Sequence, residues 1–152
     1  MTVTIRPAVQ EDFAKILPLA HSFFAASNYG DLVEFSDDTF RRTFEQLLGD
    51  SGVCLVAEDS GAIVGAVGAI TYPFYFNEGH RTGQELFWWV SEGSRGRDTG
   101  ARLFHELEKW ARSVGCKTFT MVALDSVNPE TVGGIYKRAG YRASEHTYIK
   151  GL

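Results

Sequence analysis

A glycine-rich turn between two apolar segments constrains the fold of this chain more than any other feature. The bulky apolar run 84–90 ends just before the turn, and the segment 117–124 is again rich in apolar residues. Each run has the length and composition of a buried strand. Between them lies a helical pattern whose apolar stripe comprises Leu103, Phe104, Leu107, Trp110, Ala111 and Val114. Because a helix crosses between the two strands, we expect them to be parallel neighbours in one sheet.

The first half of the chain predicts three more strands and two helices. We expect strands at 2–6, 53–58 and 62–70, and helices at 10–26 and from the cap residue Ser36 to about Gly49. Asp59, Ser60 and Gly61 between two of these strands are typical of an antiparallel hairpin. Pro18 removes a backbone donor inside the first helical pattern and predicts a kink or a break there.

The remaining segments complete one domain over 1–152. An aromatic-rich loop is expected at 72–80, and Asn128 as N-cap with Pro129 opens a last helix that Gly140 closes, followed by a final strand over 141–149. The fold class is therefore α/β (α+β), with a mixed, mostly antiparallel sheet and about four helices. No repeat or linker divides the chain.

Composition and charge exclude several classes of protein. Hydrophobic residues make up 44% of the 152 residues, as in an ordinary globular domain, and a net charge of −4 disfavours nucleic acid as a partner. The sequence has neither a signal-peptide pattern nor a run of membrane-spanning length, so a cytoplasmic protein without a membrane partner is expected. Cys54 and Cys116 lie far apart without a CxxC pattern, which favours reduced structural thiols, and no metal site is expected.

The turn itself, Ser94-Arg95-Gly96-Arg97-Asp98-Thr99-Gly100-Ala101, has the outline of an anion site. Free backbone N–H groups converge where a glycine-rich turn enters a helix, and the helix dipole favours negative charge there. The dinucleotide fingerprint and the Walker A ending are both absent. From the turn alone, a phosphate site and a merely tight turn with solvated arginines have equal weight.

The order of the elements resembles the GNAT (GCN5-related N-acetyltransferase) superfamily over nearly the whole chain. The family signature [QR]-x-x-G-x-[GA] is matched at Arg95 and Gly100, and Asp98 departs from it. The opening Arg6-Pro7-Ala8 and the ending Gly140-Tyr141 are similar to the usual family ends. The run Glu-Leu-Phe-Trp-Trp-Val resembles small bacterial and phage-associated members.

The resemblance implies a site for acetyl-CoA. In GNAT folds the fourth and fifth strands splay apart, the pantetheine arm enters the gap, and the turn amides bind the pyrophosphate. The residues that the resemblance assigns to the cofactor are Val90, Arg95, Gly96, Arg97, Asp98, Thr99, Gly100, Ala101 and Asn128. A cofactor close to Gly133 and Gly134 would also explain two glycines inside a helix. Since aspartate is a favoured N-cap, we expect Asp98 to cap the crossover helix in the free protein.

The resemblance also implies two catalytic residues. Tyr136 lies where many GNAT enzymes place the tyrosine that protonates the departing thiolate, and Glu85 is the candidate base for the attacking amine. The alternatives are a tyrosine that only packs at a helix end and a glutamate exposed at a strand end. His80 is a reserve base.

The acceptor and the assembly stay open. Asp31, Glu34, Asp37 and Asp38 lie where GNAT acceptors usually bind, together with the aromatic loop 74–76, so a cationic amine is one alternative and a solvated loop is the other. The predicted function is transfer of an acetyl group from acetyl-CoA to a primary amine by direct attack in a ternary complex. The rivals are a non-catalytic CoA-binding or acyl-CoA-binding module and a nucleotide-binding protein of another α/β class. A homodimer is a further alternative.

Overall fold

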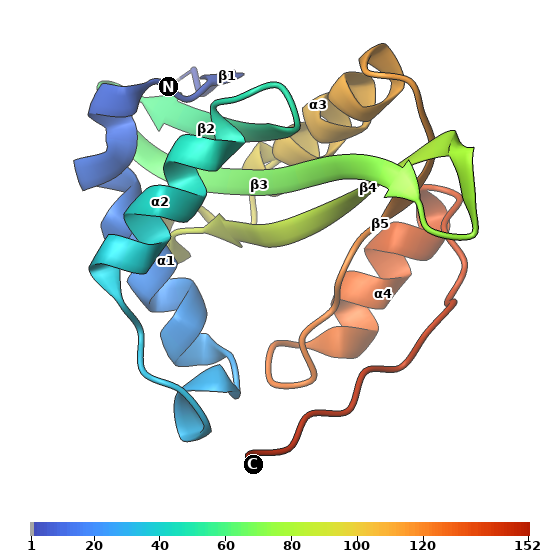
Figure 1. Ribbon diagram of the computed structural model, residues 1–152. Helices are drawn as coiled ribbons and strands as arrows, with labels where there is room; N and C mark the ends of the chain where they lie inside the picture. The colour runs from blue at the N-terminus through green and yellow to red at the C-terminus, as the bar shows by residue number, and fades with distance from the viewer. Residues whose placement is uncertain (1) are drawn as a thin grey trace.

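A five-stranded sheet forms the centre of the protein, for which the computed structural model describes residues 2–152. The strands are β1 (Thr4–Pro7), β2 (Gly52–Asp59), β3 (Ala62–Phe74), β4 (Asn77–Val90) and β5 (Cys116–Thr120), in the spatial order of their numbers. All neighbours are antiparallel except β4 and β5, which are parallel (Figure 1). The mixed, mostly antiparallel sheet is therefore confirmed.

Helices pack on both faces of this sheet. These are α1 (Phe13–Ala26) and α2 (Asp37–Leu47) on one face and α3 (Thr99–Ser113) on the other, whereas α4 (Pro129–Arg138) lies beside the open edge of the sheet (Figure 1). Alternate residues of β2 divide between two cores because successive side chains of a strand point to opposite faces. Cys54 and Val56 join the cluster under α1 and α2, whereas Leu55 joins the cluster under α3.

Pro18 lies inside α1, which is a single helix, so the predicted break into two pieces is wrong. A proline in a helix interior removes one backbone hydrogen bond, and the buried residues Phe13, Ile16, Leu19 and Ala20 hold α1 against the sheet across that position. The predicted Ser36 cap is confirmed, because its hydroxyl accepts a hydrogen bond from the amide of Thr39 at 3.2 Å.

The predicted loop 72–80 is also wrong, because β3 and β4 run through most of it and pair Phe74 with Asn77. Aromatic residues favour strands, and the rings of Phe74, Tyr75 and Phe76 pack on one another at the hairpin tip.

The predicted final strand over 141–149 does not form. Among the residues described, this segment has no strand assignment, and Tyr148 and Ile149 are exposed. Only the ring of Tyr141 packs onto the domain, 5.6 Å from the ring of Phe104. Strand formation depends on pairing and packing more than on residue type, and in the described chain no strand pairs with this segment. The fifth strand is also shorter than predicted, ending at Thr120.

The sheet opens between β4 and β5. The two strands pair from Arg81 with Cys116 to Gln84 with Thr120, and β4 continues six residues further to Val90. The register of β4 against β3 shifts after Glu85, leaving Leu86 as the extra residue of a bulge. Because a bulge bends its strand and increases the local twist, it turns the end of β4 away from β5. The predicted splay is confirmed.

Candidate active site at the open edge of β4

A cleft of about 540 Å³ lies along the unpaired edge of β4. Its walls come from β4, from α4 with the segment before it, from the turn before α3, and from the end of α1 with the 3₁₀ turn that follows. The lining residues are Phe23, Tyr29, Gln84, Glu85, Leu86, Trp88, Trp89, Val90, Arg95, Gly96, Val122, Leu124, Val127, Asn128, Thr131, Val132, Ile135 and Tyr136. Six of the eleven predicted site residues thus meet in one cavity: Glu85, Val90, Arg95, Gly96, Asn128 and Tyr136.

Val90 directs its backbone into this open edge. The amide of Ser91 donates to the carbonyl of Val64 at 2.9 Å, and Val90 pairs with Gly65. Because hydrogen bonding alternates along an antiparallel ladder, the N–H and C=O of Val90 point away from β3. The backbone of Val90 therefore offers polar groups to a ligand lying beside β4.

Arg95 folds back over the end of β4. Its Nε donates to the carbonyl of Val90 at 2.8 Å, and its guanidinium lies 4.3 Å from the centre of the Trp89 ring. This cation–π contact and the hydrogen bond fix the side chain on the protein surface. Arg97 is exposed, as Arg95 is, but the described contacts include no partner for the Arg97 side chain.

The turn 94–101 has the backbone of a helix entrance. Gly96 has a φ of 77°, which only glycine adopts readily, and a Cβ there would contact no atom within 4 Å. Thr99, at the start of α3, is 1% exposed, and its hydroxyl has no hydrogen-bond partner within the described chain. A buried hydroxyl without a partner is uncommon and favours a ligand or water at the turn.

Asp98 occupies the N-cap position of α3 but does not cap it, so that expectation is wrong. Its carboxylate makes no capping hydrogen bond, because its φ of −80° and ψ of −1° are helical whereas a capping residue is usually extended. Its carbonyl already accepts from the amide of Arg102 at 2.8 Å.

Glu85 is buried in the floor of the cleft, so the alternative of an exposed strand-end glutamate is wrong. Glu85 is only 5% exposed. Burial raises the pKa of the Glu85 carboxyl to about 8, and the neighbouring amide of Val122 opposes the shift in part. A carboxyl with this pKa exchanges its proton near neutral pH, as a general base requires.

Tyr136, on α4, lines the same cleft as Glu85, which belongs to β4. Its hydroxyl donates to the carbonyl of Val122 at 2.6 Å, and its ring stands 6.0 Å from Trp88 and 5.8 Å from Phe104. Burial, and then the charge of Glu85, raise the pKa of the Tyr136 hydroxyl well above its ordinary value. Tyr136 therefore keeps its proton at physiological pH.

The start of α4 differs from the sequence prediction in one contact. Asn128 stands at the N-cap position with a left-handed φ of 40°, and its side chain makes no capping hydrogen bond. The amide is therefore free for another partner in the cleft. A Cβ at Gly133 would meet nothing within 4 Å, which leaves open space beside this helix.

Several cleft residues were missed by sequence reasoning. Val122 contributes backbone groups, which no sequence motif marks, and Phe23 and Trp89 were assigned to core patterns. The reserve base His80 and the acids Asp31, Glu34, Asp37 and Asp38 are not among the cleft-lining residues described. Asp37 instead pairs with His21 at 2.9 Å.

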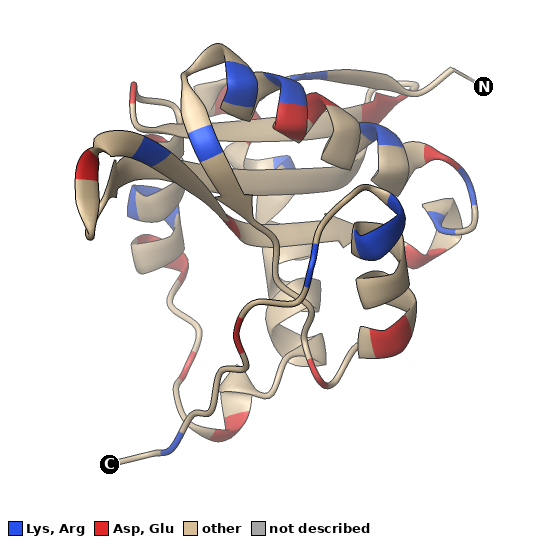
Figure 2. Ribbon diagram, turned by 90° about the vertical axis from the view of Figure 1, so that its right-hand side faces the viewer, with Lys and Arg blue, Asp and Glu red and all other residues tan. Residues whose placement is uncertain are grey.

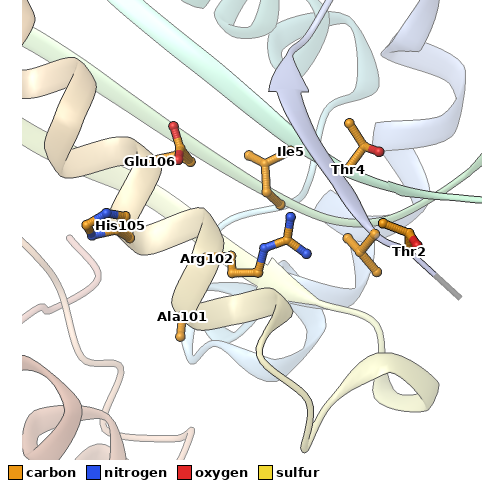
Figure 3. A pocket seen from close by; sticks show the side chains of 8 residues that line it. Thr2, Thr4, Ile5, Ala101, Arg102, His105 and Glu106 are labelled. Atoms are coloured by element: carbon orange, nitrogen blue, oxygen red, sulfur yellow. The ribbon is translucent and has the colours of Figure 1, made fainter.

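Two other observations concern possible sites outside this cleft. Within residues 2–152 no group of three or more His, Cys, Asp or Glu side chains could hold a metal ion. A second hollow, between β1 and α3, is lined by residues that include Arg102, His105 and Glu106 (Figure 3). It contains none of the catalytic candidates.

The sequence profile of the acetyltransferase (GNAT) family matches residues 13–141, which include β4, the turn, α3 and α4. This chain belongs to the GNAT family. No curated protein matches the sequence. None of the helices in the described part of the GNAT domain is long and apolar enough to cross a membrane.

Solved structures share this GNAT fold over their whole length. AAC(6')-Iy, in complex with the bisubstrate analog CoA-S-monomethyl-acetylneamine, is 15% identical with a TM-score of 0.80, covering 100% of this chain and 99% of that one. Ribosomal-protein-alanine N-acetyltransferase from Brucella melitensis biovar Abortus 2308 is 24% identical, with a TM-score of 0.72 and 99% of both chains covered. Glucosamine-6-phosphate N-acetyltransferase from Arabidopsis thaliana is 20% identical, with a TM-score of 0.76, and the match covers 99% of this chain and 98% of that one. At these identities the likeness establishes the fold alone.

Proposed function

We propose that this protein transfers an acetyl group from acetyl-CoA to a primary amine by direct attack in a ternary complex. The observation that carries the proposal is the meeting of Glu85 and Tyr136 at one residue, Val122, in a cleft along the open edge of β4. One group accepts a proton near neutral pH and the other keeps its proton. In acyl transfer from a thioester to an amine, the first group accepts a proton from the amine and the second donates a proton to the departing sulfur.

The cofactor contacts follow from the same geometry. The backbone of Val90 offers hydrogen bonds to the pantetheine arm, and the backbone amides at the start of α3 are the groups for the pyrophosphate. The free amide of Asn128 lines the same cleft. These groups fit acetyl-CoA, which supplies the acetyl thioester.

Glu85 acts on the nucleophile. An ammonium has no lone pair, so the amine must lose a proton before its nitrogen bonds to the acetyl carbon. The ionised Glu85 carboxylate accepts this proton, directly or through a water. With a pKa of about 8, Glu85 becomes fully competent only as the pH rises towards and beyond that value.

Tyr136 acts on the leaving group. As the carbon–sulfur bond breaks, the sulfur takes the electron pair, and the Tyr136 hydroxyl donates its proton to give the free thiol of CoA. The hydroxyl must first release the carbonyl of Val122, to which it donates at 2.6 Å. Once bonded to the acetyl carbon, the amine nitrogen loses its second proton, which returns through solvent to the Tyr136 oxygen. Glu85 then releases its own proton to solvent, so one proton is set free in each turnover.

The rival function is a CoA-binding module without turnover. Asp98 favours it, because it brings a negative charge to a turn meant for phosphate, and Arg95 is turned towards β4 instead of the turn. A screen that follows free thiol release from acetyl-CoA over many amines decides between the two. Binding of acetyl-CoA without turnover on any amine would favour the non-catalytic CoA-binding module.

The acceptor that these contacts support carries only the charge of its amine. Glu85 is the single acidic residue among the described lining residues, and the four acids near α2 lie outside the lining. Figure 2 shows basic and acidic residues interspersed over helices and loops rather than gathered in one stripe. A polycationic acceptor thus has no matching wall in the cleft.

A further inference from the structure

We propose that the acceptor is a small primary amine with an uncharged, apolar body, aromatic or branched, that packs on Trp89. This inference rests on the proposed function, because it assigns the part of the cleft that the acetyl-CoA contacts leave free. Those contacts come from the α3 turn and α4. The remaining wall belongs to the end of α1, the 3₁₀ turn Tyr29–Asp31 and one face of β4.

That remaining wall is aromatic. Trp89 belongs to the core face covered by α1, whereas its neighbours Trp88 and Val90 belong to the face covered by α3. The ring of Phe23 meets Trp89 edge-on at 5.9 Å and 86°. Tyr29 is 38% exposed and lines the cleft beside them. The rings of Trp89 and Tyr29 are therefore partly open to a ligand that reaches Glu85 from the α1 side.

The aromatic wall is held in place from two directions. Arg95 covers Trp89 at 4.3 Å and is itself fixed by the carbonyl of Val90. The hydroxyl of Ser126 donates to the carbonyl of Ala26 at 2.6 Å, which ties the end of α1 to the segment that leaves β5. A rigid wall binds a rigid apolar group with little further loss of side-chain freedom.

The charges of the cleft exclude a strongly polar acceptor. Within the described lining, Glu85 and Arg95 are the only residues with ionisable acid or basic side chains, and Arg95 already makes two contacts. Besides tyrosines, the uncharged polar side chains of the lining are Gln84, Asn128 and Thr131, and Gln84 already accepts a hydrogen bond from Tyr72. These are few partners for the hydroxyls of a sugar or the ammonium groups of a polyamine, and burying such groups without partners is costly. An apolar body requires no such partners, and Glu85 in the floor of the cleft is only 5% exposed.

The test compares amines at saturating acetyl-CoA by thiol release. The set contains 2-phenylethylamine, 3-methylbutylamine and ethylamine, with spermidine, neamine, glucosamine 6-phosphate and a peptide bearing an N-terminal alanine. Burying a phenyl or branched group should raise kcat/KM about ten- to a hundredfold over ethylamine. A higher kcat/KM for spermidine, neamine, the sugar phosphate or the peptide overturns this inference and leaves the proposed function standing.

Binding is measured separately so that a lack of turnover also decides the inference. Calorimetry on the protein saturated with CoA compares 2-phenylethylamine with ethylamine. Tighter binding of the aryl amine supports the inference even when no amine is acetylated, an outcome that rejects the proposed function alone. Equal binding of the two amines overturns the inference.

Variants locate the contact. Trp89→Ala and Tyr29→Ala should each lower kcat/KM for 2-phenylethylamine several-fold more than for ethylamine. Tyr29 is the milder change because its side chain is partly exposed and lies outside both core clusters. Tyr75→Ala, at the hairpin tip and 70% exposed, is the matched control and should leave the ratio as in the wild type. An unchanged ratio in folded Trp89→Ala and Tyr29→Ala proteins overturns the inference.

Discussion

The hydroxyl of Tyr136 donates to the carbonyl of Val122 at 2.6 Å, and the amide of the same Val122 faces the carboxyl of Glu85. One residue of the segment after β5 thus lies next to both catalytic candidates. Val122 lies beyond the last paired residue Thr120, so its backbone groups are free of the sheet. The splay of β4 from β5 makes this arrangement available, because paired strands would have used those groups in the ladder.

Replacing Tyr136 with phenylalanine should lower kcat about 10²- to 10⁴-fold, the usual contribution of a positioned proton donor. The ring and its packing on Trp88 and Phe104 stay. Stopped-flow or steady-state thiol release measures kcat, and calorimetry measures acetyl-CoA affinity, which should change little. Wild-type kcat in this variant removes Tyr136 from the catalytic residues.

The same variant should lose about 1 kcal/mol of unfolding free energy from the deleted hydrogen bond. Urea unfolding at neutral pH measures it. Tyr141→Phe is a fitting control, because its ring belongs to the same aromatic cluster, 6.0 Å from Tyr136, but it does not contact Val122 among the described hydrogen bonds. A kcat loss in Tyr136→Phe alone separates catalysis from packing.

The kcat/KM of the wild type should rise with pH up to about 8 and then level off for as long as the amine and Tyr136 are not limiting. The reason is that Glu85, with a pKa near 8, must be ionised to accept the proton. Glu85→Gln should remove this ionisation from the profile and lower kcat/KM at least 10²-fold at pH 8. A Gln variant that retains the wild-type profile would assign the titration to another group.

Glu85 should also make stability depend on pH. Its folded-state pKa is raised above the ordinary 4.5, so the unfolded chain releases the proton first and folding stability falls as pH rises from about 4.5 through 8. Glu85→Gln lacks this loss. Between pH 4.5 and 8 the unfolding free energy of Glu85→Gln should therefore increase relative to that of the wild type, by a few kcal/mol in order of magnitude. Above pH 8 the difference between the two free energies should stay constant. Thermal unfolding at intervals of pH measures the gap, and a pH-independent gap contradicts the buried carboxyl.

The sequence predicted the parts of this molecule that local patterns encode. The crossover helix, the antiparallel hairpin and the parallel pair came from periodicity and turn residues, and the cleft brings Glu85 and Tyr136 together as the family resemblance implied. The sequence could not show the Val122 contact, because backbone groups carry no residue signature. Nor could it show the absence of a strand over 141–149, since strand formation depends on the packing context of a segment more than on its residue types.

The predicted N-cap hydrogen bonds of α3 and α4 are absent for a related reason. Both Asp98 and Asn128 are residue types that favour N-caps, and both stand at the N-cap position without making the side-chain bond. Their backbone angles, helical at Asp98 and left-handed at Asn128, are fixed by the turns that precede each helix. Propensity predicted the place of each residue correctly and its contact wrongly.

Asp98 yields the last prediction. Because its carboxylate is exposed and makes no cap, its main effect on acetyl-CoA is repulsion of the pyrophosphate at the start of α3. Asp98→Asn removes the charge and keeps the shape, so it should tighten CoA binding about two- to fivefold, the scale of an exposed charge pair. Salt screens the wild-type repulsion, so the advantage of Asn should be largest at low ionic strength and shrink towards 1 M salt. Calorimetry with CoA across that range measures both effects, while the unfolding free energies of the two proteins should agree within about 0.5 kcal/mol. Weaker binding in Asp98→Asn would mean that the carboxylate holds the turn in its binding shape, and the repulsion account would then be wrong.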